Sequence, residues 1–190
     1  MSTVGVLALQ GDVREHLNTL VSLGVTAVPV KKPDQLGSLD ALVIPGGEST
    51  TIGKMAVRFD LLDPMRDAIR GGLPTYGTCA GLILLAGAVT EGDQPLIGVL
   101  DVVVRRNAFG RQNESFEADI DIIGMEEPFR AVFIRAPWVE KVGSEVEVLA
   151  SVADHPVMVR QETILASSFH PELTGDGRAH QLLLDLILRT

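Results

Sequence analysis

The first half of the chain alternates short apolar runs with segments whose apolar residues recur every three or four positions. The apolar runs predict strands at Val4–Leu9, Val25–Val30, Ala41–Ile44 and Leu73–Tyr76. The intervening segments predict helices at Val13–Val21, Thr50–Ala56, Leu61–Arg70 and Leu82–Ala86. We expect Asp12 to cap the first helix, Gly24 to end it, and Pro29 to mark an edge strand or a bend. Strands that are apolar on both faces, alternating with helices, predict a parallel α/β sheet.

The second half of the chain has a different pattern, with short apolar runs and few helical segments between them. These runs predict strands at Val99–Arg105, Phe116–Ile122, Ala131–Ile134, Val146–Val152, Val157–Gln161 and Thr163–Ser168. We expect them to add antiparallel strands to the sheet and loops over its active end. A last helix is expected after Asp176, with an apolar side made of Leu182, Leu183, Leu186 and Ile187. No linker divides the 190 residues, so we expect a single domain over 1–190.

Composition excludes several classes of function. A net charge of −9 argues against a nucleic-acid partner, because phosphate contacts need clustered Lys and Arg. The single cysteine cannot form an intramolecular disulfide, which favours a reducing cytoplasm. The N-terminus lacks the basic residues of a signal peptide, and no apolar stretch reaches about 18 residues. We therefore expect a cytoplasmic protein with no membrane span.

The segment Gly77-Thr78-Cys79-Ala80-Gly81 lies between a predicted strand and a predicted helix, which indicates a sharp turn. At such a turn the sulfur of Cys79 would project above the sheet, as the serine does in the Gly-x-Ser-x-Gly nucleophile elbow. The positive end of the following helix would favour its thiolate. For a lone cysteine, a buried structural residue is the more common interpretation. The choice between the two depends on whether a base is available.

Of the four histidines, His170 is the best candidate for that base. It follows a predicted strand and begins His170-Pro171-Glu172, in which extended backbone points residues 170 and 172 the same way. A carboxylate at Glu172 could then select the tautomer of the imidazole and stabilise its protonated form. His16 and His180 have polar neighbours on predicted helices and are interpreted as surface residues. His155 precedes a proline in a predicted turn.

Gly46-Gly47, at the end of a predicted strand, is a candidate oxyanion site. Acyl transfer needs backbone N–H donors, and these could come from Gly47 and from Ala80. The alternative is a simple turn. Gly53-Lys54 lacks the glycine spacing and the following hydroxyl residue of a phosphate loop. The scattered histidines and the single cysteine argue against a metal site, and the pattern implies no cofactor.

Together these motifs resemble those of the class I (triad) glutamine amidotransferases, and specifically the glutaminase subunits of pyridoxal 5′-phosphate synthases. The resemblance implies a flavodoxin-like, three-layer α/β fold, mainly parallel with antiparallel additions. The blocks that carry it are Leu9–His16, Pro45–Ser49, Gly77–Gly81, Arg106–Gln112, Ser115–Glu117, Phe133–Pro137 and Ser168–Glu172. They span nearly the whole chain. The connecting segments Val89–Pro95 and Val139–Glu145 carry no signal.

The resemblance implies hydrolysis of L-glutamine through a thioester on Cys79, with His170 and Glu172 completing the catalytic triad. It also implies a glutamine-binding set made of Gly46, Gly47, Glu48, Arg106, Ile134 and Arg135. A substrate α-carboxylate needs a cation, which Arg106 could supply. Alternation along a strand would place only one of Arg105 and Arg106 in the site. Glu48 and Arg135 could contribute backbone groups alone.

The resemblance also supplies a partner, a separate (β/α)8-barrel synthase subunit that receives the ammonia and forms a hetero-oligomer with this chain. It implies weak glutaminase activity until that subunit docks. We hypothesise that Gln10 and the Gly46-Gly47 loop respond to docking. Three alternatives are kept: a glutaminase that serves another synthase, a cysteine hydrolase or chaperone with the same elbow, and a binding domain with a buried cysteine. The triad and the Arg106–Gln112 block argue against them.

Overall fold

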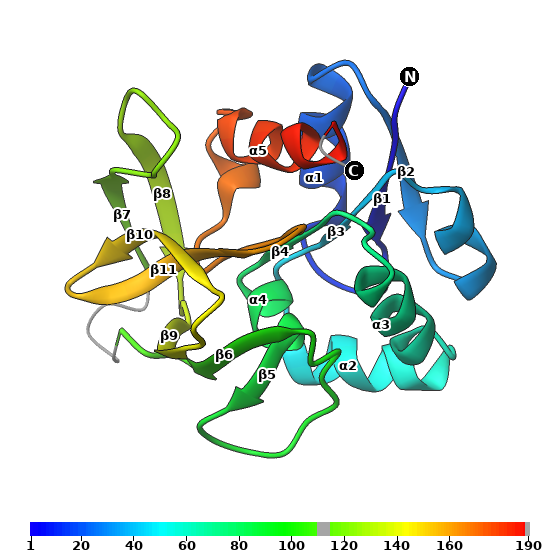
Figure 1. Cartoon of the computed structure of the whole chain (residues 1–190), viewed down its shortest axis with the longest axis horizontal. Helices are drawn as coiled ribbons and strands as arrows, with labels where there is room; N and C mark the ends of the chain where they lie inside the picture. The colour runs from blue at the N-terminus through cyan, green and yellow to red at the C-terminus, as the bar shows by residue number, and fades with distance from the viewer. Residues whose placement is uncertain (110–114, 189–190) are drawn as a thin grey trace.

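The computed structural model describes residues 1–109 and 115–188, and its central element is a 7-stranded sheet with helices on both faces (Figure 1). The strand order is β10-β11-β12-β4-β3-β1-β2. Their bounds are β1 Thr3–Leu7, β2 Thr26–Val30, β3 Ala41–Ile44, β4 Thr75–Thr78, β10 Glu147–Val152, β11 His155–Gln161 and β12 Ile164–Ser167. Five of them, β2-β1-β3-β4-β12, are parallel and follow the flavodoxin-like order. The predicted parallel α/β sheet is therefore confirmed.

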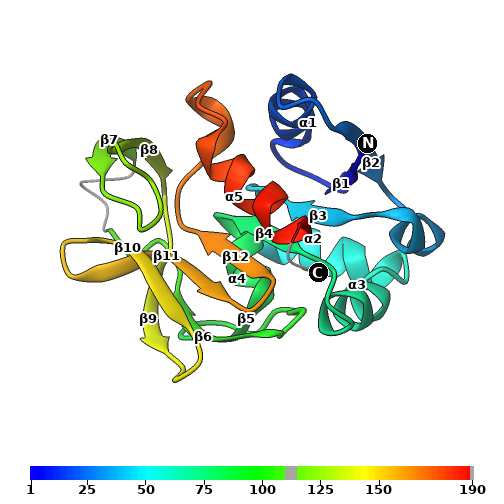
Figure 2. The ribbon, with the colours of Figure 1, turned by 45° about the horizontal axis from the view of Figure 1, so that its top comes forward.

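The layers follow from the burial of the strands. Every residue of β3, β4 and β12 is buried, as expected for strands covered on both faces. On one face α1 and α5 bury Leu20 and Leu183, and on the other α2, α3 and α4 bury Ile52, Met65 and Leu82 (Figures 1 and 2). The helices are α1 Val13–Ser22, α2 Ser49–Arg58, α3 Leu62–Arg70, α4 Ala80–Leu85 and α5 Arg178–Ile187, with short 3-10 turns η1 Pro33–Ser38 and η3 Pro171–Leu173.

The antiparallel additions are fewer than the sequence indicated. Among the residues that the structure describes, only β10 and β11 extend the central sheet in antiparallel fashion. The strand predicted at Thr163–Ser168 is β12, which pairs parallel with β4. The other strands form two small sheets of their own, beside one end of the central sheet (Figure 1). Those sheets are β5-β6-β9 (Ala86–Val89, Leu100–Arg105, Trp138–Val142) and β7-β8 (Ser115–Ile120, Phe129–Ile134).

Several boundaries differ from those expected. β1 ends at Leu7, two residues early, and the strands β5 and β9 were not predicted. β9 falls in a segment that carried no sequence signal. Pro29 does lie on an edge strand, and Gly24 follows the end of α1 with φ +81°. Within residues 1–109 and 115–188, no helix has both the length and the apolar character needed to cross a bilayer.

Candidate active site

Cys79 occupies the sharp turn between β4 and α4 that the sequence predicted. Its backbone has φ 49° and ψ −100°, a conformation that costs about 1–3 kcal/mol in a residue other than glycine. The flanking glycines have a steric reason. A Cβ on Gly77 would press on the backbone of Gly81, and one on Gly81 would overlap the carbonyl oxygen of Ile44. Close packing of α4 on the sheet therefore excludes larger residues at both positions.

Strand register brings Cys79 and His170 together. In the parallel pair β4 and β12, Thr78 is the partner of Ser167, so both strands end at the same edge of the sheet. The N–H of Cys79 donates to the carbonyl of Ser167 at 2.8 Å, which fixes this exit. His170 then follows three residues later. The two side chains are 91 positions apart in the sequence (170 minus 79) but belong to neighbouring strand ends.

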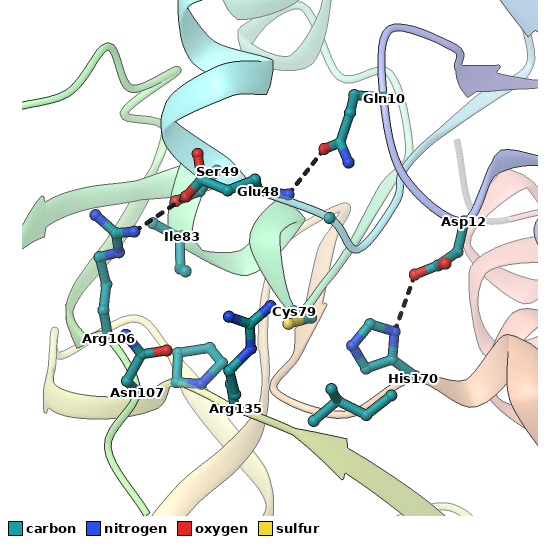
Figure 3. Close-up of a pocket in the computed structure, with 13 residues that line it drawn as sticks. Gln10, Asp12, Glu48, Ser49, Cys79, Ile83, Arg106, Asn107, Arg135 and His170 are labelled. Atoms are coloured by element: carbon teal, nitrogen blue, oxygen red, sulfur yellow. Dashed lines mark hydrogen bonds and ion pairs between the residues drawn. The ribbon is translucent and has the colours of Figure 1, made fainter. Parts of the chain in front are cut away.

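The His170 ring is held by carboxylates on one nitrogen and faces Cys79 with the other. Its Nδ1 lies 2.7 Å from Glu172 Oε1 and 3.3 Å from Asp12 Oδ2, and the second nitrogen lies on the Cys79 side (Figure 3). Burial alone would lower the pKa of His170, but hydrogen bonds with Asp12, Cys79 and Glu172 outweigh it and raise the pKa to about 12. The imidazole is therefore protonated at neutral pH and can act as a proton donor.

Asp12 has a different place from the one expected. It stands at the N-cap position of α1, yet its side chain makes no capping hydrogen bond. Its carboxylate instead approaches His170, as Figure 3 shows. Asp12, His170 and Glu172 also offer ligand atoms within 4.8 Å of one another, a composition that could hold a cation. Such an ion would have to displace the proton that Nδ1 shares with Glu172.

A cavity of about 350 Å³ opens in front of Cys79 and His170, within the size range of small-molecule sites. Six other residues that the sequence singled out line it, namely Gln10, Gly47, Glu48, Arg106, Ile134 and Arg135. The remaining three lie behind the lining. Gly46 packs against the His170 ring, Ala80 begins α4, and Glu172 is 6% exposed. The motif residues therefore converge on one site.

Glu48 organises one wall of the cavity with its side chain as well as its backbone. Its Oε2 accepts from Thr51 N at 2.9 Å and caps α2, and its Oε1 lies 3.2 Å from Arg106 Nη2. Burial favours a higher pKa for Glu48, but hydrogen bonds from Thr51 and Thr50 and the Arg106 charge leave that pKa lowered. Its N–H donates to Gln10 Oε1 at 2.8 Å (Figure 3).

Arg105 and Arg106 take opposite roles, as alternation predicted. Arg105 lies outside the cavity lining and pairs with Glu140 and Glu91. Arg106 lines the cavity beside Glu48. The next part of this motif block, residues 110–112, lies outside the described residues.

The expectation that His16 and His180 are surface residues is wrong. Both rings are fully buried, between α1 and α5, with His16 Nδ1 2.8 Å from His180 Nε2. Their helices present these polar residues to the sheet because each ring finds a partner there. The turn predicted at His155 is also misplaced, since that residue begins β11 and stacks on Trp138.

Sequence reasoning missed Gln94, which lies in a segment judged to carry no signal. Its Oε1 accepts from Ser49 Oγ and from Thr50 Oγ1, both at 3.1 Å, at the start of α2. Thr50 in turn contacts Arg106 at 3.4 Å. A lone glutamine in a polar stretch gives no pattern that predicts this contact. For Asp12, the available signal was Gln10, two residues earlier in the same motif block.

The buried histidines make stability depend on pH. Burial lowers the pKa of His180 to about 4, and burial, then His180 and His170, lower the pKa of His16. The unfolded chain, with histidine pKa values near 6.5, then binds more protons, so stability present above pH 6.5 is lost as pH falls. His170, with its raised pKa, acts in the opposite direction: its contribution to stability grows as pH falls through 6.5, so it offsets part of this loss. Urea unfolding should show about 2 kcal/mol less stability from His180 at pH 5 than at pH 7.

The control for this pH dependence is a second single-histidine variant. In His180→Phe the loss between pH 7 and pH 5 should shrink, whereas in His155→Gln, which alters a half-buried ring, it should match the wild type. Equal losses in all three proteins would contradict the assignment.

Comparison with known proteins supports what the geometry indicates. The model of the SNO glutamine amidotransferase family matches residues 6–188. A protein of Frankia alni named "Pyridoxal 5'-phosphate synthase subunit PdxT" is 60% identical over 97% of this chain and 94% of its own length. A protein of the same name from Parafrankia sp. is 62% identical over 97% of this chain and 92% of its own length.

Solved structures give the same result. One described as a glutamine amidotransferase superposes with a TM-score of 0.93 at 53% identity, covering 97% of this chain and 98% of that one. A putative GMP synthase component from Thermoplasma acidophilum, 18% identical with a TM-score of 0.71 over 100% and 95% of the two chains, shares the fold. The fold is thus that of the glutamine amidotransferases. Within that class, the chain belongs to the SNO glutamine amidotransferase family, which confirms the resemblance seen in the motifs.

Proposed function

We propose that this chain is the glutaminase subunit of a pyridoxal 5′-phosphate synthase: it hydrolyses L-glutamine to L-glutamate and ammonia for a synthase partner. Relatives of 60% and 62% identity carry the name of a subunit of that enzyme. The observation that carries the proposal is the convergence of Cys79, His170 and Glu172 at neighbouring strand ends above an open cavity. We also propose that residues 1–190 act as one domain in the cytoplasm, where the free thiol stays reduced.

The triad accounts for both halves of the hydrolysis. The sulfur of Cys79 attacks the side-chain amide carbon of glutamine, and the C–N bond breaks as His170 gives its proton to the departing ammonia. The raised pKa of His170 supports this role as acid. The ring then takes a proton from water, which attacks the thioester and releases glutamate and the sulfur. Glu172, 2.7 Å from Nδ1, holds the ring in the tautomer that both steps need.

The tetrahedral intermediate of each step needs backbone donors, which we assign to Gly47 and Ala80. Gly47 lines the cavity with φ +153°, and a Cβ there would crowd Gln10 Oε1. Ala80 directly follows the nucleophile at the start of α4. A glycine at position 47 therefore keeps the donor close to the substrate and close to the Gln10 loop.

Substrate recognition falls to the other wall of the cavity. Arg106 supplies the cation for the α-carboxylate of glutamine, and its contacts with Glu48 and Thr50 fix its position. Gly46-Gly47-Glu48 and Ile134-Arg135 approach from two different strand ends, β3 and β8, and shape the space for the side chain. Arg135 has φ 43°, so its backbone turns sharply at the cavity edge.

The partner is a separate synthase subunit, for which we propose the (β/α)8-barrel form in a hetero-oligomer. We propose that the loop of residues 10–12 couples docking of the synthase subunit to the active site. Gln10 accepts from Glu48 N, and Asp12 N donates to the carbonyl of Gly46 at 3.2 Å. Movement of this loop on docking would therefore move the proposed oxyanion donor on Gly47.

Glutamate release, measured with and without the synthase, tests this function. We expect the synthase to raise the rate at least about tenfold, which is within the usual range of coupling between sites. Gln10→Ala should reduce that stimulation, while Gln181→Ala, which alters an exposed glutamine on α5, should leave it intact. Equal rates with and without the synthase would contradict the proposed coupling. The absence of glutamate release in both cases would contradict the proposed glutaminase function.

A further inference from the structure

Two buried imidazoles lie directly behind the triad and take no part in the mechanism described so far. His16 comes from α1 and His180 from α5, and both have 0% exposure. Their nearest nitrogens, His16 Nδ1 and His180 Nε2, are 2.8 Å apart. Burying two polar rings costs free energy unless their nitrogens make hydrogen bonds. The position of the pair therefore needs a reason.

The second ring nitrogen of His16, Nε2, points at the carboxylate of Glu172 in the triad. His16 Nε2 lies 3.4 Å from Glu172 Oε2 and 3.2 Å from Thr78 Oγ1, the hydroxyl of the residue before Cys79. The other oxygen of Glu172, Oε1, accepts the hydrogen bond from His170 Nδ1. Within residues 1–109 and 115–188, Oε2 makes no well-aligned hydrogen bond, and His16 is the ring that faces it. The contacts thus form a continuous series from His180 through His16, Glu172 and His170 to Cys79.

The proton positions in this series follow from elimination. Burial, with the charges of His180 and His170, lowers the pKa of His16, so the ring is neutral and carries one proton. His16 Nε2 faces an ionised Glu172, which can only accept, and the Thr78 hydroxyl, which can donate or accept, so a proton on Nε2 suits both neighbours. His16 Nδ1 is then an acceptor, which makes His180 Nε2 the donor. The opposite tautomers would leave an N–H at His180 Nδ1, an atom with no partner among the described residues.

We propose that His16 is a positioning residue for glutamine hydrolysis, donating from Nε2 to Glu172 while His180 fixes its tautomer. This inference rests on the function proposed above. Burial raises the pKa of Glu172, and the hydrogen bond from His170 only partly offsets that effect. A donor on the second oxygen stabilises the ionised form further. His16 therefore keeps Glu172 charged and aligned, so that Glu172 can hold His170 in turn.

The other titratable groups around Glu172 do not duplicate this role. Asp12, before α1, is acidic and opposes the charge on Glu172. Tyr76, on β4, has a pKa raised by burial and donates or accepts at Ser167 Oγ, 2.9 Å away. From β8, the backbone carbonyl of Val132 accepts a hydrogen bond from His170 N. His16 is thus the neutral donor next to Oε2.

Two substitutions at His16, tested in the complex with the synthase, separate positioning from packing. His16→Leu removes the donor and keeps an apolar filler, whereas His16→Gln places an amide N–H near the position of Nε2. Two readouts are followed against pH: kcat/KM for glutamate release, and the rate at which iodoacetamide alkylates Cys79, the only cysteine. The second readout does not depend on glutamine being the substrate.

In His16→Leu we expect the acid limb of both profiles to move up by about one pH unit, because the charged form of Glu172 loses the N–H that faces it at 3.4 Å. The KM for glutamine should stay unchanged, since His16 does not line the cavity. His16→Gln should return the limb towards the wild type. An unmoved limb in His16→Leu, or equal shifts in both variants, would overturn the proposal. A wild type that releases no glutamate contradicts the proposed function, while the alkylation profile still tests His16.

A second pair of variants covers the case in which His16→Leu does not fold. His180→Gln keeps a donor towards His16 Nδ1, so the tautomer of His16 and the acid limb should be retained. His180→Leu leaves that nitrogen free to take the proton, which turns a lone pair towards Glu172 and should move the limb up. Identical limbs in these two variants would overturn the assigned tautomers.

Discussion

Cys79→Ser is expected to lower glutamate release by at least about 10³-fold without unfolding the protein. The serine hydroxyl is close in size to the thiol and fits the turn, where φ is 49° and the neighbouring glycines leave room for one small side chain. A serine alkoxide is far harder to form than a thiolate, so the hydroxyl is a much weaker nucleophile at this position. The assay is glutamate release in the presence of the synthase, with urea unfolding as the check on the fold.

Two comparisons make the Cys79 result decisive. A glutamine-mimicking diazo-ketone should add once to the wild type, at Cys79, and should not add to Cys79→Ser. Cys79→Ser with wild-type activity would show that the sulfur is not the nucleophile, whatever the geometry of the turn.

Gly46→Ala is expected to have the second largest effect, a fall of about 10² in kcat, because it adds one methyl group against the triad histidine. A Cβ on Gly46 would overlap His170 Cε1 and lie 2.9 Å from Nδ1. The ring cannot retreat freely, since Glu172 and Asp12 hold Nδ1. A displacement of about 1 Å at a catalytic group can cost that factor.

The matched control for Gly46→Ala is Gly37→Ala, in η1. A Cβ there meets no atom within 4 Å, so activity should be unchanged. Unfolding by urea should show both variants folded. Wild-type kcat in Gly46→Ala would mean that the His170 ring can move without loss, and that its position in this structure is not the one that the reaction uses.

The site was predictable where the chemistry is written in short, local motifs. The glycines around Cys79 indicated a tight turn, and the structure gives each a specific overlap that it avoids. His170 and Glu172 were picked out by their spacing of two residues, although the expected extended backbone is wrong there, because residues 171–173 form the 3-10 turn η3. Alternation indicated that only one of Arg105 and Arg106 would enter the site, and the family resemblance chose Arg106. In each case the residues that gave the signal lie within a few positions of one another, although their contacts in the fold reach further.

The failures concern contacts between distant segments. His16 and His180 were taken for surface residues because their sequence neighbours are polar, but each is buried by the other across 164 positions. Asp12 was taken for a helix cap, yet its carboxylate is drawn to the His170 ring, which arrives from the far end of the chain. Strands β5 and β9 were missed because they are short and partly exposed.

Residues 10–12 contact two separate parts of the active site, the triad histidine and the Gly46-Gly47 loop. Asp12 contacts His170, while Gln10 and Gly11 pack against Gly47 and Gly46. The proton donor and the loop proposed to hold the developing anion therefore share one mechanical support and cannot be adjusted independently. With the docking proposed above, a substitution in this segment that weakens binding of the partner also disturbs the contacts with His170 and Gly47. Engineering of the assembly should begin at surfaces away from it.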